Sequence, residues 1–189
     1  MSITTALDAL IDRYVRFYAE HNKPLLVERQ DDWDAPIYRE PWDNDPDYVI
    51  WQPVQQTHPL NFKDLAAALE MPFQSDFADY YSRWFAGDLA VDWNHHPLQL
   101  LHIHCREDGE RLLANCAGHI LMKRRLKQPP TLFIGLAEEA DDLLLTVDNE
   151  TGVVGLEWVG QGQHEVLADS LEAFIQEVTP RLQSSDEEA

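Results

Sequence analysis

The chain has 189 residues, of which 44% are hydrophobic and 10% are aromatic. This length and composition exclude intrinsic disorder of the whole chain and are typical of one domain with a buried core. The 34 acidic and 14 basic residues give a formal net charge of −20, so the surface repels nucleic acid phosphates and attracts cationic partners. The same acidity would also be explained by solubility alone.

The first third of the chain is predicted to form a helix, an acidic loop and a strand. Residues 3–20 carry apolar side chains at helical spacing, with Thr4 or Thr5 as the cap. The stretch DDWDAPIYREPWDNDPDY at 31–48 combines seven carboxylates with four aromatic rings. Its three prolines exclude a long helix and predict an ordered loop. A strand is expected over 48–54.

The middle of the chain is predicted to contain three helices and one hairpin. Two short helices are expected at 62–70 and 76–84, and a long one at 107–127, where a double proline ends it. The strands LAVDW and LQLLHI are expected to flank the turn NHHP. The residues expected to form the buried face of the long helix are Leu113, Cys116, Ala117, Ile120 and Leu121. Gly118 is expected to allow close approach of this helix to the sheet.

The last third is predicted to consist of strands at 131–137, 143–148 and 153–159, then a helix that buries Leu171, Phe174, Ile175 and Val178. Asp169 or Ser170 is expected to cap this helix. Clustered hairpins with flanking helices predict the α+β class, with a central, mostly antiparallel or mixed sheet and helices packed around it. We expect a single domain over 1–182 and a short, acidic, disordered tail at 183–189.

The compartment is predicted from segments that the sequence lacks. No charged region followed by an apolar core opens the chain, and no apolar run approaches the roughly 20 residues that span a bilayer. We therefore expect a cytoplasmic protein, with any membrane association supplied by a partner or by surface charge. Cys105 and Cys116 are expected to be free, buried thiols, as is usual in that compartment.

One segment of the chain suggests a metal site. HHPLQLLHIHC at 95–105 contains four histidines and a cysteine. On a strand, His102 and His104 would share the polar face while Leu101 and Ile103 face the core, and no second ligand pair has structural-zinc spacing. The chain also has no G-x-S-x-G elbow, no glycine-rich phosphate loop and no H-E-x-x-H. We therefore expect no metal, no cofactor and no enzymatic activity.

A basic run, KRRLK, ends the long predicted helix with Lys123, Arg124, Arg125 and Lys127. Cations at a helix C-terminus complement the helix dipole, each contributing roughly 0.3–1 kcal/mol. The alternative is a patch that faces anionic lipid, at about 1 kcal/mol per residue.

Several stretches together resemble one family. They are IWQP at 50–53, RWFAGD at 83–88, GH at 118–119, RRLKQPPTLFI at 124–134 and LADSLEAFI at 167–175. In this order and spacing they resemble the Syd family of bacterial proteins, which interact with the SecY subunit of the translocation channel. Residues 62–88 are also similar to the helix–turn–helix opening of the wider superfamily that contains the Smi1/Knr4-type immunity proteins.

The resemblance implies an α+β fold without catalysis. It further implies translocon quality control or regulation, by binding to basic cytoplasmic loops of SecY at the cytoplasmic face of the inner membrane, through an electronegative concave surface. The alternative from the wider superfamily is an immunity-type protein that neutralises a basic toxin such as a nuclease. The resemblance is weakest over 21–47, so residues there are candidates through their charge alone.

The candidate binding residues are acids, which would steer a basic loop, and aromatic anchors. We expect the acids to gather in one concavity. Asp88 of the FAGD motif could instead be a turn or cap carboxylate. The acidic candidates are Asp31, Asp32, Asp34, Glu40, Asp43, Asp45, Asp47 and Asp88, and the aromatic candidates are Trp33 and Trp42.

Overall fold

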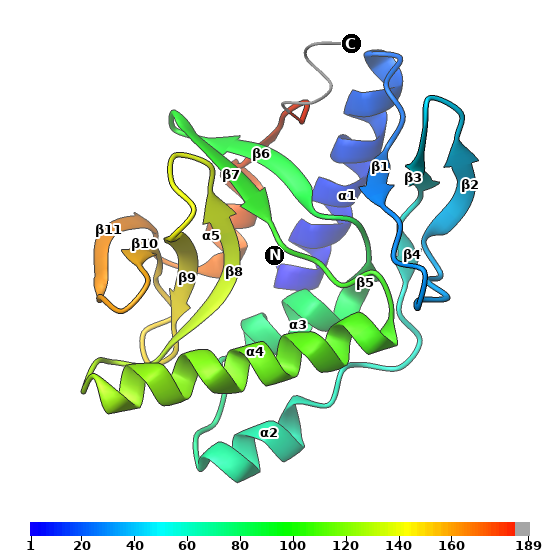
Figure 1. The fold of residues 1–189 in the computed structure, drawn as a ribbon. Helices are drawn as coiled ribbons and strands as arrows, with labels where there is room; N and C mark the ends of the chain where they lie inside the picture. Colours follow the sequence, from blue (N-terminus) through cyan, green and yellow to red (C-terminus); the bar gives the residue numbers. More distant parts are fainter. Residues whose placement is uncertain (184–189) are drawn as a thin grey trace.

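A computed structural model describes residues 1–183 of the chain. Its main element is a seven-stranded antiparallel sheet with the order β11-β10-β9-β8-β7-β6-β12 (Figure 1). The strands are β6 (Leu89–Trp93), β7 (His96–Leu100), β8 (Thr131–Ala137), β9 (Leu143–Asp148), β10 (Val154–Trp158), β11 (Gln163–Ala168) and β12 (Thr179–Pro180). The predicted α+β class is confirmed.

A second, smaller sheet replaces the predicted acidic loop. It has the order β1-β3-β2, formed by β1 (Leu26–Glu28), β3 (Asp45–Trp51) and β2 (Tyr38–Trp42). The loop prediction was wrong because Pro41 and Pro46 occupy strand positions where the missing N–H group does not interrupt the hydrogen bonds between strands. Pro41 is in the edge strand β2, and Pro46 lies beyond the last β1 partner of β3, Tyr48. A short pair, β4 (Val54–Gln55) with β5 (Trp84–Phe85), completes the strands.

The described residues contain five helices: α1 (Ile3–Glu20), α2 (Phe62–Leu69), α3 (Ser75–Arg83), α4 (Arg106–Arg125) and α5 (Leu171–Glu177). Helices α1, α3 and α5 contact one another, while α4 packs on β8 and carries α2 on its outer side (Figure 1). Ser2, and not Thr4 or Thr5, caps α1 by accepting the Thr5 amide. Ser170 caps α5 as predicted. Among residues 1–183, no helix combines the length and hydropathy that a membrane crossing requires.

The buried face of α4 agrees with the prediction only in part. Its buried apolar side chains are Leu112, Cys116 and Ile120, of which Cys116 and Ile120 were predicted, whereas Leu121 is 51% exposed. Gly118 lies on the outer side, and a Cβ atom there would meet nothing within 4 Å. The expectation that Gly118 allows close approach to the sheet is therefore wrong.

The hairpin β6–β7 is tighter than predicted. Its turn is the pair Asn94 and His95, with φ of 41° and 73°, so Trp93 pairs with His96 and β7 ends at Leu100. His102 therefore follows the strand and is 5% exposed, so its assignment to a polar strand face is wrong. The tight turn starts β7 two residues earlier than the pattern suggested.

Both cysteines are free and buried, as predicted. Burial raises the pKa of the Cys105 thiol to about 11 and that of Cys116 to about 12, so both remain protonated at neutral pH. The predicted acidic tail at 183–189 lies outside the described residues, apart from Gln183.

Candidate functional site

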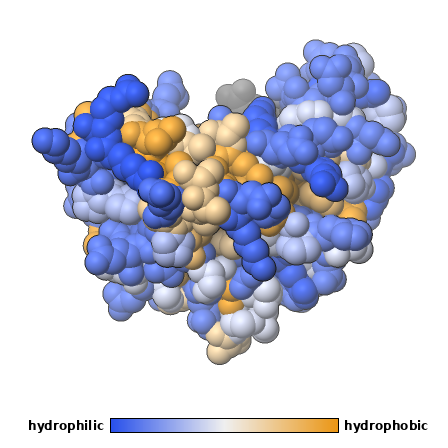
Figure 2. Space-filling view, turned by 90° about the horizontal axis from the view of Figure 1, so that it is seen from below, coloured by the Kyte–Doolittle hydropathy of each residue, from blue (hydrophilic) through white to orange (hydrophobic). Residues whose placement is uncertain are grey.

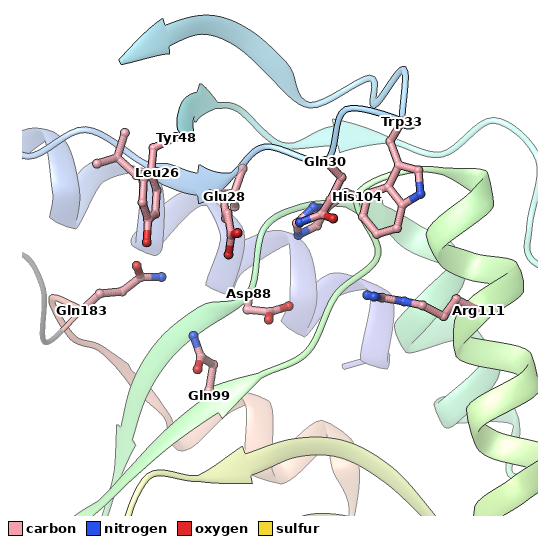
Figure 3. A pocket seen from close by; sticks show the side chains of 11 residues that line it. Leu26, Glu28, Gln30, Trp33, Tyr48, Asp88, Gln99, His104, Arg111 and Gln183 are labelled. Carbon is pink, nitrogen blue, oxygen red and sulfur yellow. The ribbon is translucent and has the colours of Figure 1, made fainter. Parts of the chain in front are cut away.

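A polar cavity of about 330 Å³ opens between the small sheet, the main sheet and the N-terminal half of α4. In Figure 3, Tyr48 and Glu28 extend from the small sheet toward Asp88, which precedes β6, and Gln99 of β7, and Arg111 reaches across from α4. We call this space the Asp88 cavity. It is lined by Leu26, Val27, Glu28, Gln30, Trp33, Tyr48, Asp88, Gln99, His104, Arg111 and Gln183.

The position of Asp88 is set by the glycine before it. A Cβ atom on Gly87 would lie 2.7 Å from Trp51 Cε2 and 2.7 Å from Val27 Cγ1, so only glycine allows the chain to pass this closely. The neighbouring Ala86 amide donates to the Ile103 carbonyl at 3.0 Å. The stretches IWQP and RWFAGD therefore meet at Trp51 and Gly87, and this packing brings Asp88 to the cavity.

Asp88 is half-buried and is held by one backbone hydrogen bond. The His102 amide donates to its Oδ1 at 3.1 Å. Burial raises the pKa of Asp88 to about 7, because the carboxylate loses hydration; this hydrogen bond and the Arg111 charge oppose the rise, and Asp108 adds to it. Near neutral pH, Asp88 is therefore partly ionised, and a positive charge nearby would favour its carboxylate form.

The small sheet directs acidic and aromatic side chains to the same side. Glu28 is opposite Tyr48 in the β1–β3 register, and Glu40 is opposite Ile50 in the β3–β2 register. Since paired residues share a face and alternate residues of a strand do too, Glu28, Tyr48, Ile50 and Glu40 lie on one face. The Trp42 ring lies edge-on to Tyr48, with centroids 6.4 Å apart. This face combines two carboxylates with two aromatic rings.

Arg111 is the one arginine or lysine of the cavity lining within residues 1–183. Its Nη2 atom pairs with Asp108 Oδ1 at 2.8 Å, and its guanidinium carbon lies 5.1 Å from the centre of the Trp33 ring. Asp108 thus balances the Arg111 charge, while Glu28 and Asp88 have no cation paired with them in the described chain. The lining is therefore acidic in balance.

A second cavity of about 160 Å³ adjoins the first and shares Asp88, His104 and Arg111 with it. His102 also lines it, and neither of its ring nitrogens has a hydrogen-bond partner within the described chain. Burial lowers the pKa of His102 to about 4, so the ring is neutral. Among residues 1–183, no group of three or more histidine, cysteine or acidic side chains is arranged to hold a metal ion.

The predicted binding residues are only partly brought together. Asp88 and Trp33 line the Asp88 cavity, and Trp42 lies beside its wall residue Tyr48. The other acids lie outside the lining, in the segment before β2 or on the β2–β3 hairpin: Asp31, Asp32, Asp34, Glu40, Asp43, Asp45 and Asp47. Sequence reasoning missed Glu28, because the three-residue strand β1 is too short to give a periodic signal.

Lys123 does not belong to the predicted basic patch, because its side chain is fully buried under α4. Its Nζ lies 3.2 Å from Glu157 Oε1 and donates to the Gln161 carbonyl at 2.8 Å. Thr131 and Thr146 donate to the two Glu157 oxygens at 2.8 and 2.9 Å. These residues form what we call the Glu157 network.

His119 extends this network. Its Nε2 lies 3.0 Å from the Thr131 hydroxyl. Since the Thr131 hydrogen is directed at Glu157, the Thr131 oxygen accepts from Nε2–H. Burial lowers the pKa of His119, which is consistent with this neutral form. The GH stretch thus contributes an internal hydrogen bond through its histidine.

Comparisons with known proteins agree on one family. The family model "Syd protein (SUKH-2)" matches residues 4–180. Protein Syd of Idiomarina loihiensis is 47% identical over 97% of both chains. Protein Syd of Alteromonas mediterranea is 40% identical over 92% of this chain and 96% of its own. Protein Syd of Pseudoalteromonas atlantica is 39% identical over 95% of this chain and 96% of its own.

Proposed function

This chain belongs to the Syd family, and from that premise we propose that it is a non-enzymatic binding protein that docks on SecY. The partner segments would be basic cytoplasmic loops of the translocation channel. Docking would hold the protein at the cytoplasmic side of the inner membrane as a peripheral protein, in translocon quality control or regulation. The observation that carries the proposal is the Asp88 cavity, with its unpaired carboxylates and aromatic walls.

The cavity would receive a lysine or arginine side chain of the loop. A positive charge close to Asp88 stabilises its carboxylate form, so the guest would lower the raised pKa and form a charge-assisted contact. Glu28 provides a second carboxylate at the entrance wall. The Tyr48 ring suits the aliphatic stem and the cationic head of such a side chain, while Arg111 already lies over one face of the Trp33 ring.

The acids outside the lining would act at longer range. Exposed carboxylates of the β2–β3 hairpin, such as Asp43 and Asp47, raise the encounter rate with a basic loop more than they raise the final affinity. Such steering weakens with salt, because the Debye length is about 8 Å at physiological ionic strength.

The first test is retention of SecY from solubilised inner membranes on the immobilised chain, with the retained proteins identified by mass spectrometry. The proposal predicts that SecY is retained and that Asp88→Asn reduces its affinity about tenfold. Retention of a basic toxin in place of SecY would contradict the proposal and support the immunity function. Binding that does not weaken with rising salt would contradict electrostatic steering.

A charge-matched pair of variants tests the hairpin. Reversal of Asp43, Asp45 and Asp47 to lysine should slow association with a basic SecY loop without unfolding the protein. The control reverses the exposed acids Asp141, Asp142 and Glu150, which lie in turns between strands of the main sheet, and it changes net charge equally. Equal slowing in both variants would assign the effect to net charge and remove the hairpin from the docking surface.

A further inference from the structure

We propose that the C-terminal end of α4 is a contact surface for anionic phospholipid headgroups. The surface consists of three cations, Arg124, Arg125 and Lys127, and three exposed apolar side chains, Leu121, Leu126 and Val159. We call it the α4-end patch. The inference rests on the proposed function, because it describes how a chain docked at the membrane would face the lipid beside its partner.

The three cations lie close together at the end of one helix, and no carboxylate pairs with any of them. Among residues 1–183, none of the three forms an ion pair, whereas Arg16, Arg29, Arg83, Arg111 and Arg181 do. Five other cations also lack an ion pair, but they are far apart in the sequence: Arg13, Lys23, Arg39, Lys63 and Arg106. Arg124 donates instead to the Leu69 carbonyl oxygen at the end of α2. The helix dipole explains why cations are favoured here, and without a paired carboxylate their charge is available to an anionic surface.

The patch also exposes apolar side chains that the core does not use. Leu121 is 51% exposed, Leu126 is 47% exposed and Val159 is 49% exposed. Leu121 precedes Arg124 and Arg125 by three and four residues, so it shares their side of the helix. Leu126 lies next to Gly160, the residue after Val159. Exposed apolar side chains on the same helix end as cations match the boundary between acyl chains and anionic headgroups.

The α4-end patch and the Asp88 cavity are separate surfaces on one rigid helix. Arg111 and Arg125 are 14 positions apart, which corresponds to about 21 Å along α4. Figure 2 looks from below Figure 1, at the face of α2 and α4. At its left side, where α4 ends, it shows strongly hydrophilic side chains beside a hydrophobic area. A protein segment in the cavity would therefore leave the patch free.

Because the whole protein is strongly acidic, the α4-end patch can hold it at an anionic membrane only together with a second contact. Each basic residue close to an anionic leaflet strengthens binding about fivefold, so three provide about 100-fold. A body with a net charge of −20 is repelled by the same leaflet, and this repulsion opposes the gain. We therefore expect the patch to strengthen a complex that another contact already holds at the membrane, as in other proteins that combine two weak signals.

The test uses vesicles that contain reconstituted SecY, prepared either from phosphatidylcholine alone or with phosphatidylglycerol added. The wild-type chain should bind the anionic vesicles more tightly than the neutral ones. Arg125→Gln with Lys127→Asn should weaken binding to the anionic vesicles about 10- to 30-fold and leave binding to the neutral ones unchanged. The control pair, Lys23→Gln with Lys63→Gln, removes the same charge elsewhere and should have little effect.

The outcomes separate the two proposals. Equal affinity of the wild-type chain for both vesicles, or equal loss in the test and control pairs, would overturn the lipid contact. Absence of binding to SecY in neutral vesicles would overturn the proposed function instead. Leu121→Ser should weaken binding only to the anionic vesicles, and an unchanged affinity there would exclude the apolar part of the patch.

Discussion

Two sets of buried polar groups within residues 1–183 differ in how their hydrogen bonds are satisfied. In the Glu157 network, both carboxylate oxygens accept hydrogen bonds, and Lys123 and Thr131 share one of them. Around the Asp88 cavity, both His102 ring nitrogens and His104 Nδ1 have no partner within the described chain. The first set is complete by itself, whereas the second opens to two cavities.

The difference indicates which set serves the fold and which is available for binding. Buried polar groups are almost always hydrogen-bonded, so a complete network fixes the packing of α4 on the sheet and leaves no group for a ligand. An incomplete set on a cavity wall can gain contacts when a partner arrives. The types of ionisable residue do not distinguish the two sets, since each contains carboxylate, histidine and one cation.

The largest effect is expected from breaking the complete network. Lys123→Met leaves Glu157 as a buried charge without its cation, which should lower the free energy of unfolding by about 3–5 kcal/mol. Urea unfolding would measure this change. In the double variant Lys123→Met with Glu157→Gln, most of the stability should return because the buried charge is removed. A mild effect of the single variant would mean that the network is hydrated and not structural.

Gly87→Ala tests the packing that positions Asp88. The added methyl group would lie 2.7 Å from Trp51 and Val27, and overpacking of this kind costs about 1–3 kcal/mol of stability. The displaced Asp88 should also bind a basic loop more weakly. Denaturant unfolding together with loop titration would show both changes, and unchanged affinity in the folded variant would separate Asp88 from docking.

The pH dependence of loop binding tests Asp88 itself. With a pKa of about 7, its carboxylate fraction increases from about one tenth at pH 6 to about nine tenths at pH 8, so affinity should rise about tenfold over this range. Asp88→Asn should abolish this rise in titration calorimetry. An equal pH dependence in Asp88→Asn would assign it to another group.

Ionisation of Asp88 should strengthen loop binding but lower the stability of the folded protein. The folded pKa of Asp88 exceeds the unfolded value of about 3.9, so its contribution to stability decreases as the pH rises from about 4 to 7. His96→Gln is the control. Hydrogen bonds to Glu139 and Glu165 raise the pKa of His96, so its stabilising contribution is lost as the pH rises through that folded value. This variant should change stability without changing the pH dependence of binding.

The smallest effect is expected at Gly118, which touches neither polar set. Gly118→Ala places a methyl group in open space on α4 and should stabilise the protein by up to about 1 kcal/mol through helix propensity. Thermal unfolding would detect the change. Destabilisation would show that an unrecognised contact, such as a bound partner surface, needs the glycine.

Much of the fold follows from local patterns in the sequence. Apolar spacing predicted α1, α2, α3, α4, α5 and the strands β8, β9 and β10 within a few residues. Several strands were missed because they are short or lack alternation: β1 has three residues, β12 contains Pro180, and β11 exposes three residues in succession. Such strands form because a neighbouring strand offers its edge, and local sequence contains no signal for that.

The candidate site was only partly predictable. The net charge predicted binding of a basic partner, and the FAGD motif together with this charge indicated Asp88, because composition and short motifs are visible in the sequence itself. Glu28 and His102 were missed or misplaced, since burial and strand pairing decide their surroundings. The sequence shows KRRLK as one continuous basic run, but in the structure Lys123 is buried while Arg124, Arg125 and Lys127 are exposed.

The sequence by itself determined the helix and strand periods, the acidity and the family resemblance, because these depend on residues close together in the chain or on their sum. The tertiary structure alone decided which carboxylates share a cavity and which cation is buried. The Asp88 cavity joins residues from Leu26 to Gln183, and that juxtaposition arises from packing between segments far apart in the chain.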